Sequence, residues 1–120
     1  MAEPLGILLI SGGPERAHYA FLLAAGAAAL GRKVIVFATN EGTRALCTDI
    51  AGLDAQPRPA GVAGLAELRA ASVDLGVRLV ACETGLLMAG IEASKLLDGV
   101  EVAGVATFLA AVGDGQMLTL

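Results

Sequence analysis

The sequence predicts one α/β domain of three layers, in which helices cover both faces of a five-stranded, mainly parallel sheet. Short, wholly apolar runs alternate along the chain with helical segments. Such runs are typical of strands that are buried on both faces. The chain has 120 residues, of which 56% are hydrophobic, so it is long enough for one core and too short for two. We therefore expect a single domain over residues 1–120.

The elements can be justified in order from the amino terminus. The apolar run 5–10 predicts a strand, and Pro14 and Glu15 suit the first turn of a helix that ends at Gly31. A second buried strand is expected at 34–38. The elements expected after it are a short helix 43–50, a loop 52–61, a helix 63–75, a strand 77–81, short helical segments 86–89 and 92–97, a strand 100–103, a helix 105–112 and an edge strand 116–120.

Five strands in this arrangement fit the flavodoxin-like strand order 2-1-3-4-5. Right-handed crossovers then place the first strand beside the third. In such sheets, ligands bind beyond the carboxyl ends of the strands, where the winding direction reverses. The sequence therefore predicts that the turn Ser11-Gly12-Gly13 lies beside the turn that begins at Cys82.

Composition excludes several classes of protein. The net charge is -4 and there is no Trp, one Tyr and three Phe, which argues against a nucleic-acid partner. No apolar run reaches the roughly 20 residues of a membrane span, and the amino terminus does not resemble a signal peptide. We expect a cytoplasmic protein whose surplus apolar surface is buried in a homo-oligomer, through the first helix and the region 90–105.

Two cysteines and one histidine carry the candidate chemistry. With no C-x-x-C pair, we expect no metal and no cofactor. Cys47, inside a short helix, is interpreted as a packing residue. Cys82 follows a strand and precedes a helix, whose dipole and free N–H groups favour a nucleophilic thiolate, although the neighbouring Glu83 opposes it. The alternative is that Cys82 is a small buried hydrophobe.

Further residues are candidates for binding around Cys82. His18, on the first helix, could exchange a proton with Cys82 or simply be a surface histidine. The glycine-rich turn 11–13 could hold a phosphate ahead of a helix, or be only a turn. The candidate binding residues are Ser11, Gly12, Gly13, His18, Glu83, Thr84 and Gly85.

Three segments of the second half resemble the DsrE/DsrF-like family. They are the strand and cysteine at 77–82, the helical segment 85–91, and the stretch 97–108, which contains Asp-Gly-Val-Glu and Gly-Val-Ala-Thr-Phe. In the first half, Ser11-Gly12-Gly13 and the stretch 20–37 resemble the same family, in the branch also labelled peroxiredoxin-like.

The resemblance implies a flavodoxin-like subunit of a trimer or hexamer that takes part in sulfur relay. Cys82 matches the family's persulfide-carrying cysteine. The chain would then be a persulfide carrier or a sulfurtransferase subunit that exchanges sulfur with a TusA-like carrier protein. Two alternatives remain open. One is a non-catalytic oligomeric module that binds a small anion or nucleotide, and the other is a peroxide-sensing thiol.

Overall fold

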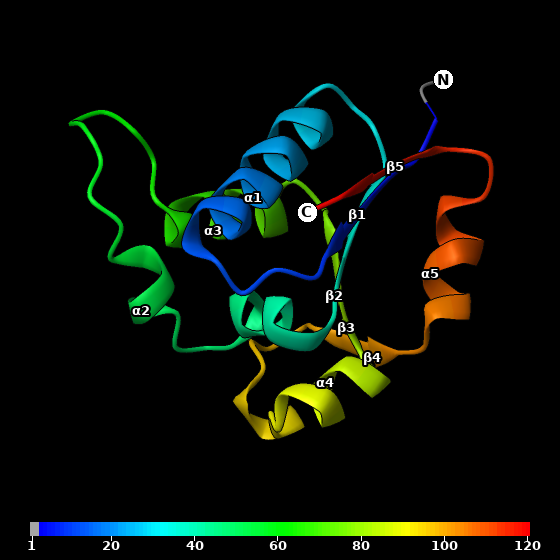
Figure 1. Cartoon of the computed structure of the whole chain (residues 1–120). Coiled ribbons are helices and arrows are strands. Elements are labelled where there is room, and N and C mark those ends of the chain that lie inside the picture. Colours follow the sequence, from blue (N-terminus) through cyan, green and yellow to red (C-terminus); the bar gives the residue numbers. More distant parts are fainter. Residues whose placement is uncertain (1–2) are drawn as a thin grey trace.

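The computed structural model describes residues 3–120, which form one five-stranded parallel sheet with helices on both faces (Figure 1). The α/β class and the three layers expected from the sequence are confirmed. The elements are, in order, β1 (Leu5–Leu9), α1 (Pro14–Ala29), β2 (Val34–Ala38), the 3-10 helix η1 (Asn40–Leu46), α2 (Ala51–Asp54), α3 (Leu65–Asp74), β3 (Arg78–Cys82), α4 (Glu83–Ala89), the 3-10 helix η2 (Ala93–Lys95), β4 (Glu101–Ala103), α5 (Val105–Val112) and β5 (Gln116–Thr119).

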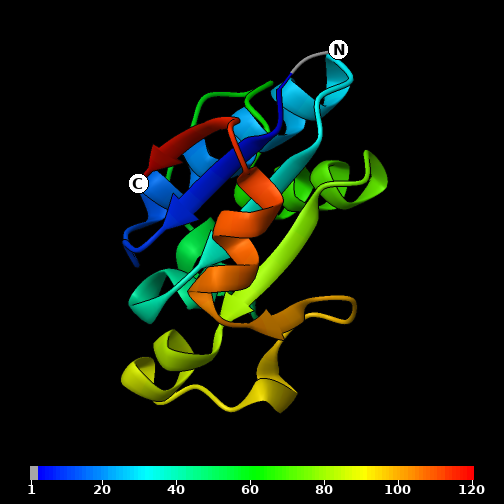
Figure 2. The same ribbon diagram turned by 90° about the vertical axis from the view of Figure 1, so that its right-hand side faces the viewer.

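The two faces of the sheet are covered unequally. Helices α1 and α3 lie on one face, and α5 lies on the other, as the two ribbon views show (Figures 1 and 2). The larger hydrophobic cluster includes Phe21 of α1 and Leu65 of α3. The smaller cluster joins Phe108 and Val112 of α5 to side chains of β2 and β3. Helix α4 lies at the carboxyl ends of the strands, in line with the sheet rather than on a face.

The predicted strand order 2-1-3-4-5 is wrong at two pairings, those of the first strand with the third and of the fourth with the fifth. The observed order is β4-β3-β2-β1-β5, so β2 separates β1 from β3, and β5 lies beside β1. The physical reason lies in the strands themselves. All five residues of β2 are buried, as an interior strand requires, whereas β4 has three residues, includes the exposed Glu101 and forms an edge. The switch of winding direction therefore falls between β1 and β5, and not beside Cys82.

Most predicted elements match the structure to within a few residues at their ends. Two segments differ. The short helix α2 (Ala51–Asp54) occupies the start of the expected loop 52–61. After β2, a 3-10 helix at 40–46 replaces the expected helix at 43–50. The reason is that Asn40 adopts a left-handed φ of 50°, which turns the chain directly out of the strand. Cys47 therefore follows this helix and pairs with Leu96 in an isolated antiparallel bridge. Within residues 3–120, no helix is long and apolar enough to cross a membrane.

Candidate functional site

Cys82 is both the last residue of β3 and the N-cap of α4. Its Sγ accepts a hydrogen bond from the backbone N–H of Gly85, at an N–S distance of 3.4 Å. The side chain is 8% exposed and packs in the smaller cluster. Two rings dominate that cluster, because Phe37 and Phe108 stack with centroids 4.8 Å apart. The predicted position of Cys82, at a strand end and before a helix, is thus confirmed, and the residue shares a hydrophobic cluster with the two stacked rings.

The first turn of α4 packs against the end of β2, and this contact was not predicted. A Cβ at Gly85 would overlap Thr39 Oγ1 and would lie 2.5 Å from the backbone N of Asn40. Only a glycine allows this approach. The Thr39 hydroxyl donates to Asn40 Oδ1 at 2.9 Å, which stabilises the turn beneath α4. Sequence reasoning missed Thr39 and Asn40 because it placed β1, and not β2, beside Cys82.

The other predicted residues on this turn differ in exposure. Glu83 and Thr84 are exposed, whereas Gly85 is buried under the β2 turn. Beyond them, α4 presents Leu87 and Met88 to solvent, 84% and 71% exposed. The structure therefore groups Glu83, Thr84 and Gly85 with Cys82, as expected, and adds an apolar surface on the same helix.

The turn Ser11-Gly12-Gly13 does not lie beside Cys82, which corrects the predicted adjacency. Because β2 lies between β1 and β3, the 3-10 helix η1 occupies the space next to this turn. A Cβ at Gly12 would lie 2.7 Å from Glu41 Cβ, and the N–H of Gly42 donates to Ile10 O at 2.9 Å. Within the turn, Ser11 Oγ accepts from the Gly13 N–H at 3.0 Å. The turn is thus closed by its own hydrogen bond, and the stem of Glu41 leaves no room for a side chain at Gly12.

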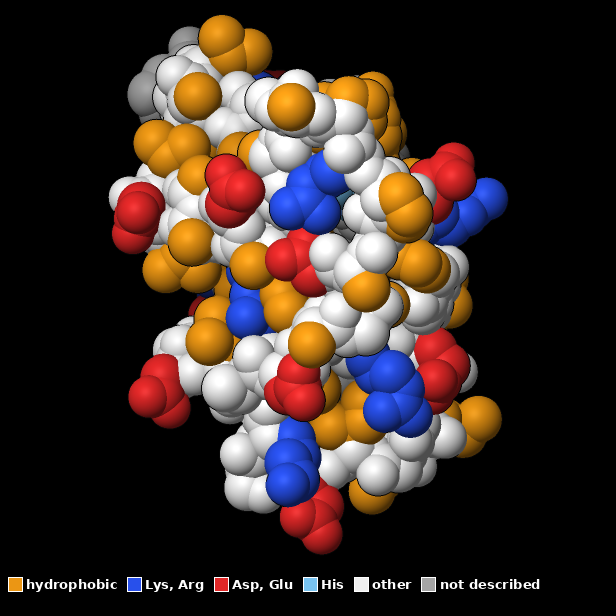
Figure 3. Space-filling model, turned by 90° about the vertical axis from the view of Figure 1, so that its left-hand side faces the viewer, with side chains coloured by type: hydrophobic (Ala, Val, Ile, Leu, Met, Phe, Trp, Pro, Cys, Tyr) orange, Lys and Arg blue, Asp and Glu red, His pale blue; other side chains and the backbone are white. Residues whose placement is uncertain are grey.

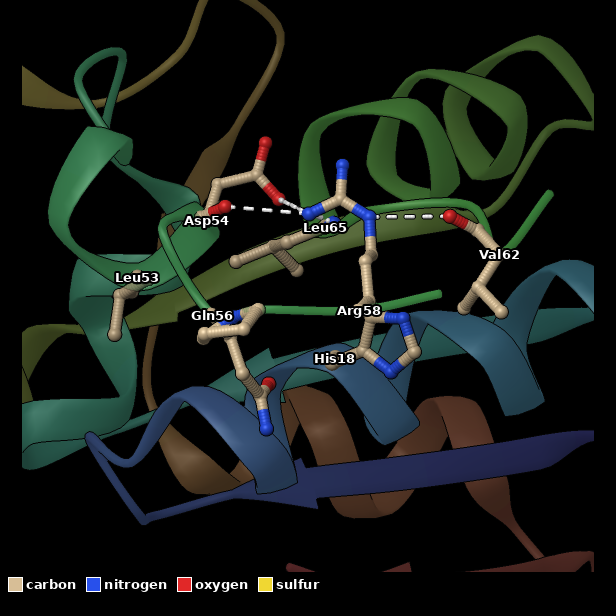
Figure 4. A pocket seen from close by; sticks show the side chains of 8 residues that line it. His18, Leu53, Asp54, Gln56, Arg58, Val62 and Leu65 are labelled. Atoms are coloured by element: carbon tan, nitrogen blue, oxygen red, sulfur yellow. Dashed lines mark hydrogen bonds and ion pairs between the residues drawn. The ribbon is translucent and has the colours of Figure 1, made fainter. Parts of the chain in front are cut away.

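His18 belongs to a different part of the molecule. It lies on α1, on the face of the sheet opposite to the cluster that holds Cys82. Its Nε2 is 2.8 Å from Ala63 O. The ring lines a cavity of about 110 Å³ beneath the segment 55–64 (Figure 4). The structure therefore does not bring His18 to the thiol.

The segment above this cavity is held by Arg58 (Figure 4). The Arg58 Nε donates to Val62 O at 3.1 Å, and Nη1 lies 3.8 Å from Asp54 Oδ1. That same carboxylate oxygen accepts from the Leu65 N–H at 2.7 Å and so caps α3. On this side of the molecule, basic and acidic side chains are interspersed over the surface (Figure 3). These contacts explain the local structure of the loop.

Cys47 lines a separate groove of about 750 Å³ between η1 and the η2 region. Burial raises the pKa of the Cys47 thiol, and the nearby charges of Arg44 and Arg69 oppose that rise without cancelling it. The buried Arg69 donates through Nη1 to the carbonyls of Ala45 and Cys47, and so fixes this segment. The raised pKa keeps the Cys47 thiol protonated and weakly nucleophilic at neutral pH. Around it the groove is lined by Arg44, Thr48, Asp49, Gly90, Ile91, Glu92, Ser94 and Lys95.

The described residues hold no group of three or more His, Cys, Asp or Glu side chains that could bind a metal ion. The two thiols also pack in different places. Cys82 belongs to the cluster under α5, and Cys47 packs against the cluster on the α1 side. Of the two, Cys82 has the backbone N–H donor to its sulfur, which stabilises negative charge there.

Comparison with known proteins agrees with this fold. The curated relative YrkE of Bacillus subtilis (strain 168) is itself uncharacterised. It is 28% identical over an alignment of 148 positions, gaps included, that covers 92% of each chain. The solved structure of ychN from E. coli has a TM-score of 0.74 and 16% identity, with all of both chains covered. MTH1491 from Methanobacterium thermoautotrophicum, of unknown function, has a TM-score of 0.68 and 19% identity, with 98% of this chain and 99% of that one covered. A profile of the DsrE/DsrF-like family matches residues 5–120, and the chain therefore belongs to that family.

Proposed function

We propose that this chain carries a sulfane sulfur on Cys82 as a subunit of a cytoplasmic sulfur relay. The observation that carries the proposal is the position of Cys82, a thiol at the end of an interior strand whose sulfur accepts the Gly85 N–H at 3.4 Å. A backbone donor directed at sulfur stabilises the negative charge of a thiolate, and of the persulfide that it forms. Membership of the DsrE/DsrF-like family supports the same role.

The reaction is a thiol exchange that needs no further oxidant. The Cys82 thiolate attacks the outer sulfur of a donor persulfide, R–S–SH. The bond between the donor's two sulfurs breaks, R–SH leaves with its electron pair and the proton, and Cys82 becomes a persulfide anion. An acceptor thiolate then repeats the step on the outer sulfur of that persulfide, and Cys82 returns to its thiolate. We propose a small carrier protein of the TusA-like type as the exchange partner.

Access to Cys82 is restricted. The residue is 8% exposed and belongs to the smaller cluster, so a sulfur donor must reach it through the small part that is open to solvent. Its outer approach is bordered by the exposed residues Glu83 and Thr84 of α4. In a persulfide the second sulfur extends about 2 Å beyond the first. We propose that an acceptor reaches this second sulfur rather than the buried first one.

Intact-mass measurement tests the assignment. Wild type, Cys82→Ser and the matched control Cys47→Ser are treated with polysulfide or with a persulfidated carrier, and then with reductant. We expect wild type and Cys47→Ser to gain one sulfur mass that the reductant removes, and Cys82→Ser to gain none. Equal loading of Cys82→Ser, or no loading of any form under conditions that load a known carrier, refutes the proposal.

The alternative is a module that binds a small anion or nucleotide at Ser11-Gly12-Gly13. No contact among residues 3–120 favours it. The Gly13 N–H is already donated to Ser11 Oγ, and Glu41 lies against Gly12. We therefore retain the sulfur relay as the single proposal.

A further inference from the structure

A pocket of about 440 Å³ lies at the amino ends of β2 and β3, on the face of the sheet that α5 covers. Ile35, near the start of β2, belongs to the smaller hydrophobic cluster under α5, and Arg78, the first residue of β3, is in register with it. Ala111 packs against the same cluster and lines the pocket from α5. Figure 2 shows this face, with β3 running beside α5. Two strands and a helix thus form the pocket, which gives it rigid walls.

The pocket is separate from the Cys82 site. Arg78 and Cys82 are the first and last residues of β3. A strand advances about 3.3 Å per residue, so these two residues lie about 13 Å apart along the strand. The pocket is at the amino end of β3 and the thiol is at its carboxyl end. A ligand in the pocket therefore does not depend on sulfur at Cys82, and either proposal can fail without the other.

Much of the lining of the pocket is apolar. Val34 and Ile35 are 5% and 4% exposed, and Pro4 and Ala111 add apolar surface beside them. Pockets that hold small organic ligands have volumes of roughly 300–1,000 Å³, with apolar walls and a few polar groups that fix the orientation of the ligand. An apolar ligand gains free energy here, because its own surface and that of the lining both leave water.

The two ionisable residues that line the pocket, Lys33 and Arg78, are both basic, although the chain as a whole carries a net charge of -4. Among residues 3–120, Lys33 forms no ion pair. Arg78 binds Glu101 through Nε at 2.6 Å and through Nη2 at 2.8 Å. This fork uses two of the five N–H donors of a guanidinium and leaves both N–H groups of Nη1 to another acceptor. Lys33, Arg78 and Glu101 together carry one positive charge, which favours a ligand with one negative charge.

We propose that this pocket binds a small monocarboxylate with an apolar body, of the type of a medium-chain fatty acid. The carboxylate accepts hydrogen bonds from the Lys33 ammonium and from Nη1 of Arg78, and the apolar chain lies against Ile35 and Ala111. A phosphate monoester fits less well, because it brings nearly two negative charges to a site whose net charge is a single positive one.

Titration with octanoate, followed through the amide NMR shifts, tests the proposal. We expect saturable shifts at Ile35, Arg78 and Ala111. The neutral 1-octanol, which has the same chain length, should bind more weakly, and acetate, which has the charge without the chain, should not bind. The proposal is overturned if octanoate gives no saturable shifts up to about 10 mM, if the shifts lie elsewhere in the protein, or if 1-octanol binds as tightly as octanoate.

Single-charge variants test the basic residues of the pocket. Lys33→Gln removes one cation from the lining, Glu101→Gln releases Arg78 from its ion pair, and the matched control Arg16→Gln removes a charge from an exposed residue of α1, on the opposite face. We expect the Kd for octanoate to rise about three- to fivefold for Lys33→Gln, to fall for Glu101→Gln and to stay unchanged for Arg16→Gln. Equal effects of Lys33→Gln and Arg16→Gln would show that only the net charge of the chain matters, and would contradict the proposal.

A filling variant tests the apolar part of the pocket without a change of charge. Ala111→Leu occupies part of the cavity, whereas the matched control Ala110→Leu adds the same side chain at an exposed position of α5. Ala111→Leu should weaken octanoate binding by at least about fivefold, and Ala110→Leu should leave it unchanged. Circular dichroism verifies the fold of both variants, and Ala111→Val supplies a smaller step if Ala111→Leu does not fold. An unchanged affinity in the folded Ala111 variant would place the ligand outside this pocket and refute the proposal.

Discussion

Replacing Gly85 with Ala will destabilise the fold, whereas the same replacement at Gly26 will stabilise it. Both glycines are helical, in α4 and α1, so each replacement gains the preference of Ala over Gly within a helix, about 0.5–1 kcal/mol. At Gly26, which is exposed, a Cβ would meet no atom within 4 Å. The gain at Gly26 is therefore unopposed.

At Gly85 the gain is outweighed by overlap with the end of β2. A Cβ there would overlap Thr39 Oγ1 and would lie 2.5 Å from Asn40 N and 2.7 Å from Thr39 Cα, all well inside van der Waals contact. Two of these three atoms are backbone, so relief requires α4 or the β2 turn to move. Overpacking of this kind costs about 1–3 kcal/mol. After the helical gain is subtracted, a net loss of about 1–2 kcal/mol is expected.

Urea denaturation measures both effects on one scale. With a slope of about 2 kcal/mol/M for a domain of this size, the midpoint should fall by about 0.5–1 M for Gly85→Ala and rise by about 0.3–0.5 M for Gly26→Ala. The slopes should match that of wild type, since neither change alters the surface exposed on unfolding. A midpoint for Gly85→Ala at or above that of wild type would refute the close packing of α4 on β2.

Three further predictions concern charge and titration. In the Cys82→Ser background, alkylation of Cys47 at neutral pH should be slower than that of free cysteine, and its rate should still rise at a pH where free cysteine is already ionised, because burial raises the pKa of the Cys47 thiol. Arg44→Gln should slow the alkylation further, since the Arg44 charge lowers that pKa. A rate equal to that of free cysteine at pH 7 would contradict the prediction. Arg69→Met should lower the free energy of unfolding, measured in urea, by about 2–3 kcal/mol, because the carbonyls of Ala45 and Cys47 lose their donor. A loss below about 0.5 kcal/mol would show that these two hydrogen bonds are not needed for stability. Hydrogen bonding from Arg78 lowers the pKa of Glu101, so the ion pair stabilises the fold when the pH is above the ordinary pKa of a carboxyl group, and this stabilisation is lost as the pH falls through the lowered pKa. The difference in Tm between wild type and Glu101→Gln should be small, since an exposed pair contributes less than about 1 kcal/mol. That difference should vanish in acid and in high salt.

The order of elements could be predicted because each strand is an apolar run bounded by a turn. The order of strands in the sheet depends on which strands can lie at an edge, and the local periodicity of a strand does not indicate this. The composition of the strands nevertheless distinguishes interior from edge strands. Val34–Ala38 is apolar throughout and suits an interior position, whereas Glu101–Ala103 is short and begins with a carboxylate. Strand composition, weighed beside topology, would have placed β2 in the interior of the sheet and β4 at an edge.

The candidate site shows the same division between local and long-range information. The position of Cys82 between a strand and a helix is local, and the sequence predicted it correctly. The residues opposite it are not local. Thr39 and Asn40 approach Gly85 only because β2 is the neighbour of β3, and His18 is distant because α1 covers the other face of the sheet. Helical periodicity finds the buried side of a helix but does not tell which face of the sheet it covers.

The strand order also brings the stacked rings of β2 and α5 into the cluster of the candidate site. Phe108 projects inward from α5 and stacks on Phe37 of β2, and both rings pack in the cluster that contains Cys82. Had β1 been the neighbour of β3, β2 would have been an edge strand, and Phe37 would have lain farther from Cys82. Because β2 is interior, the side chains that α5 buries against β2 belong to the same cluster as Cys82. The long-range order of the strands, and not the local sequence around Cys82, therefore decides which side chains surround the thiol.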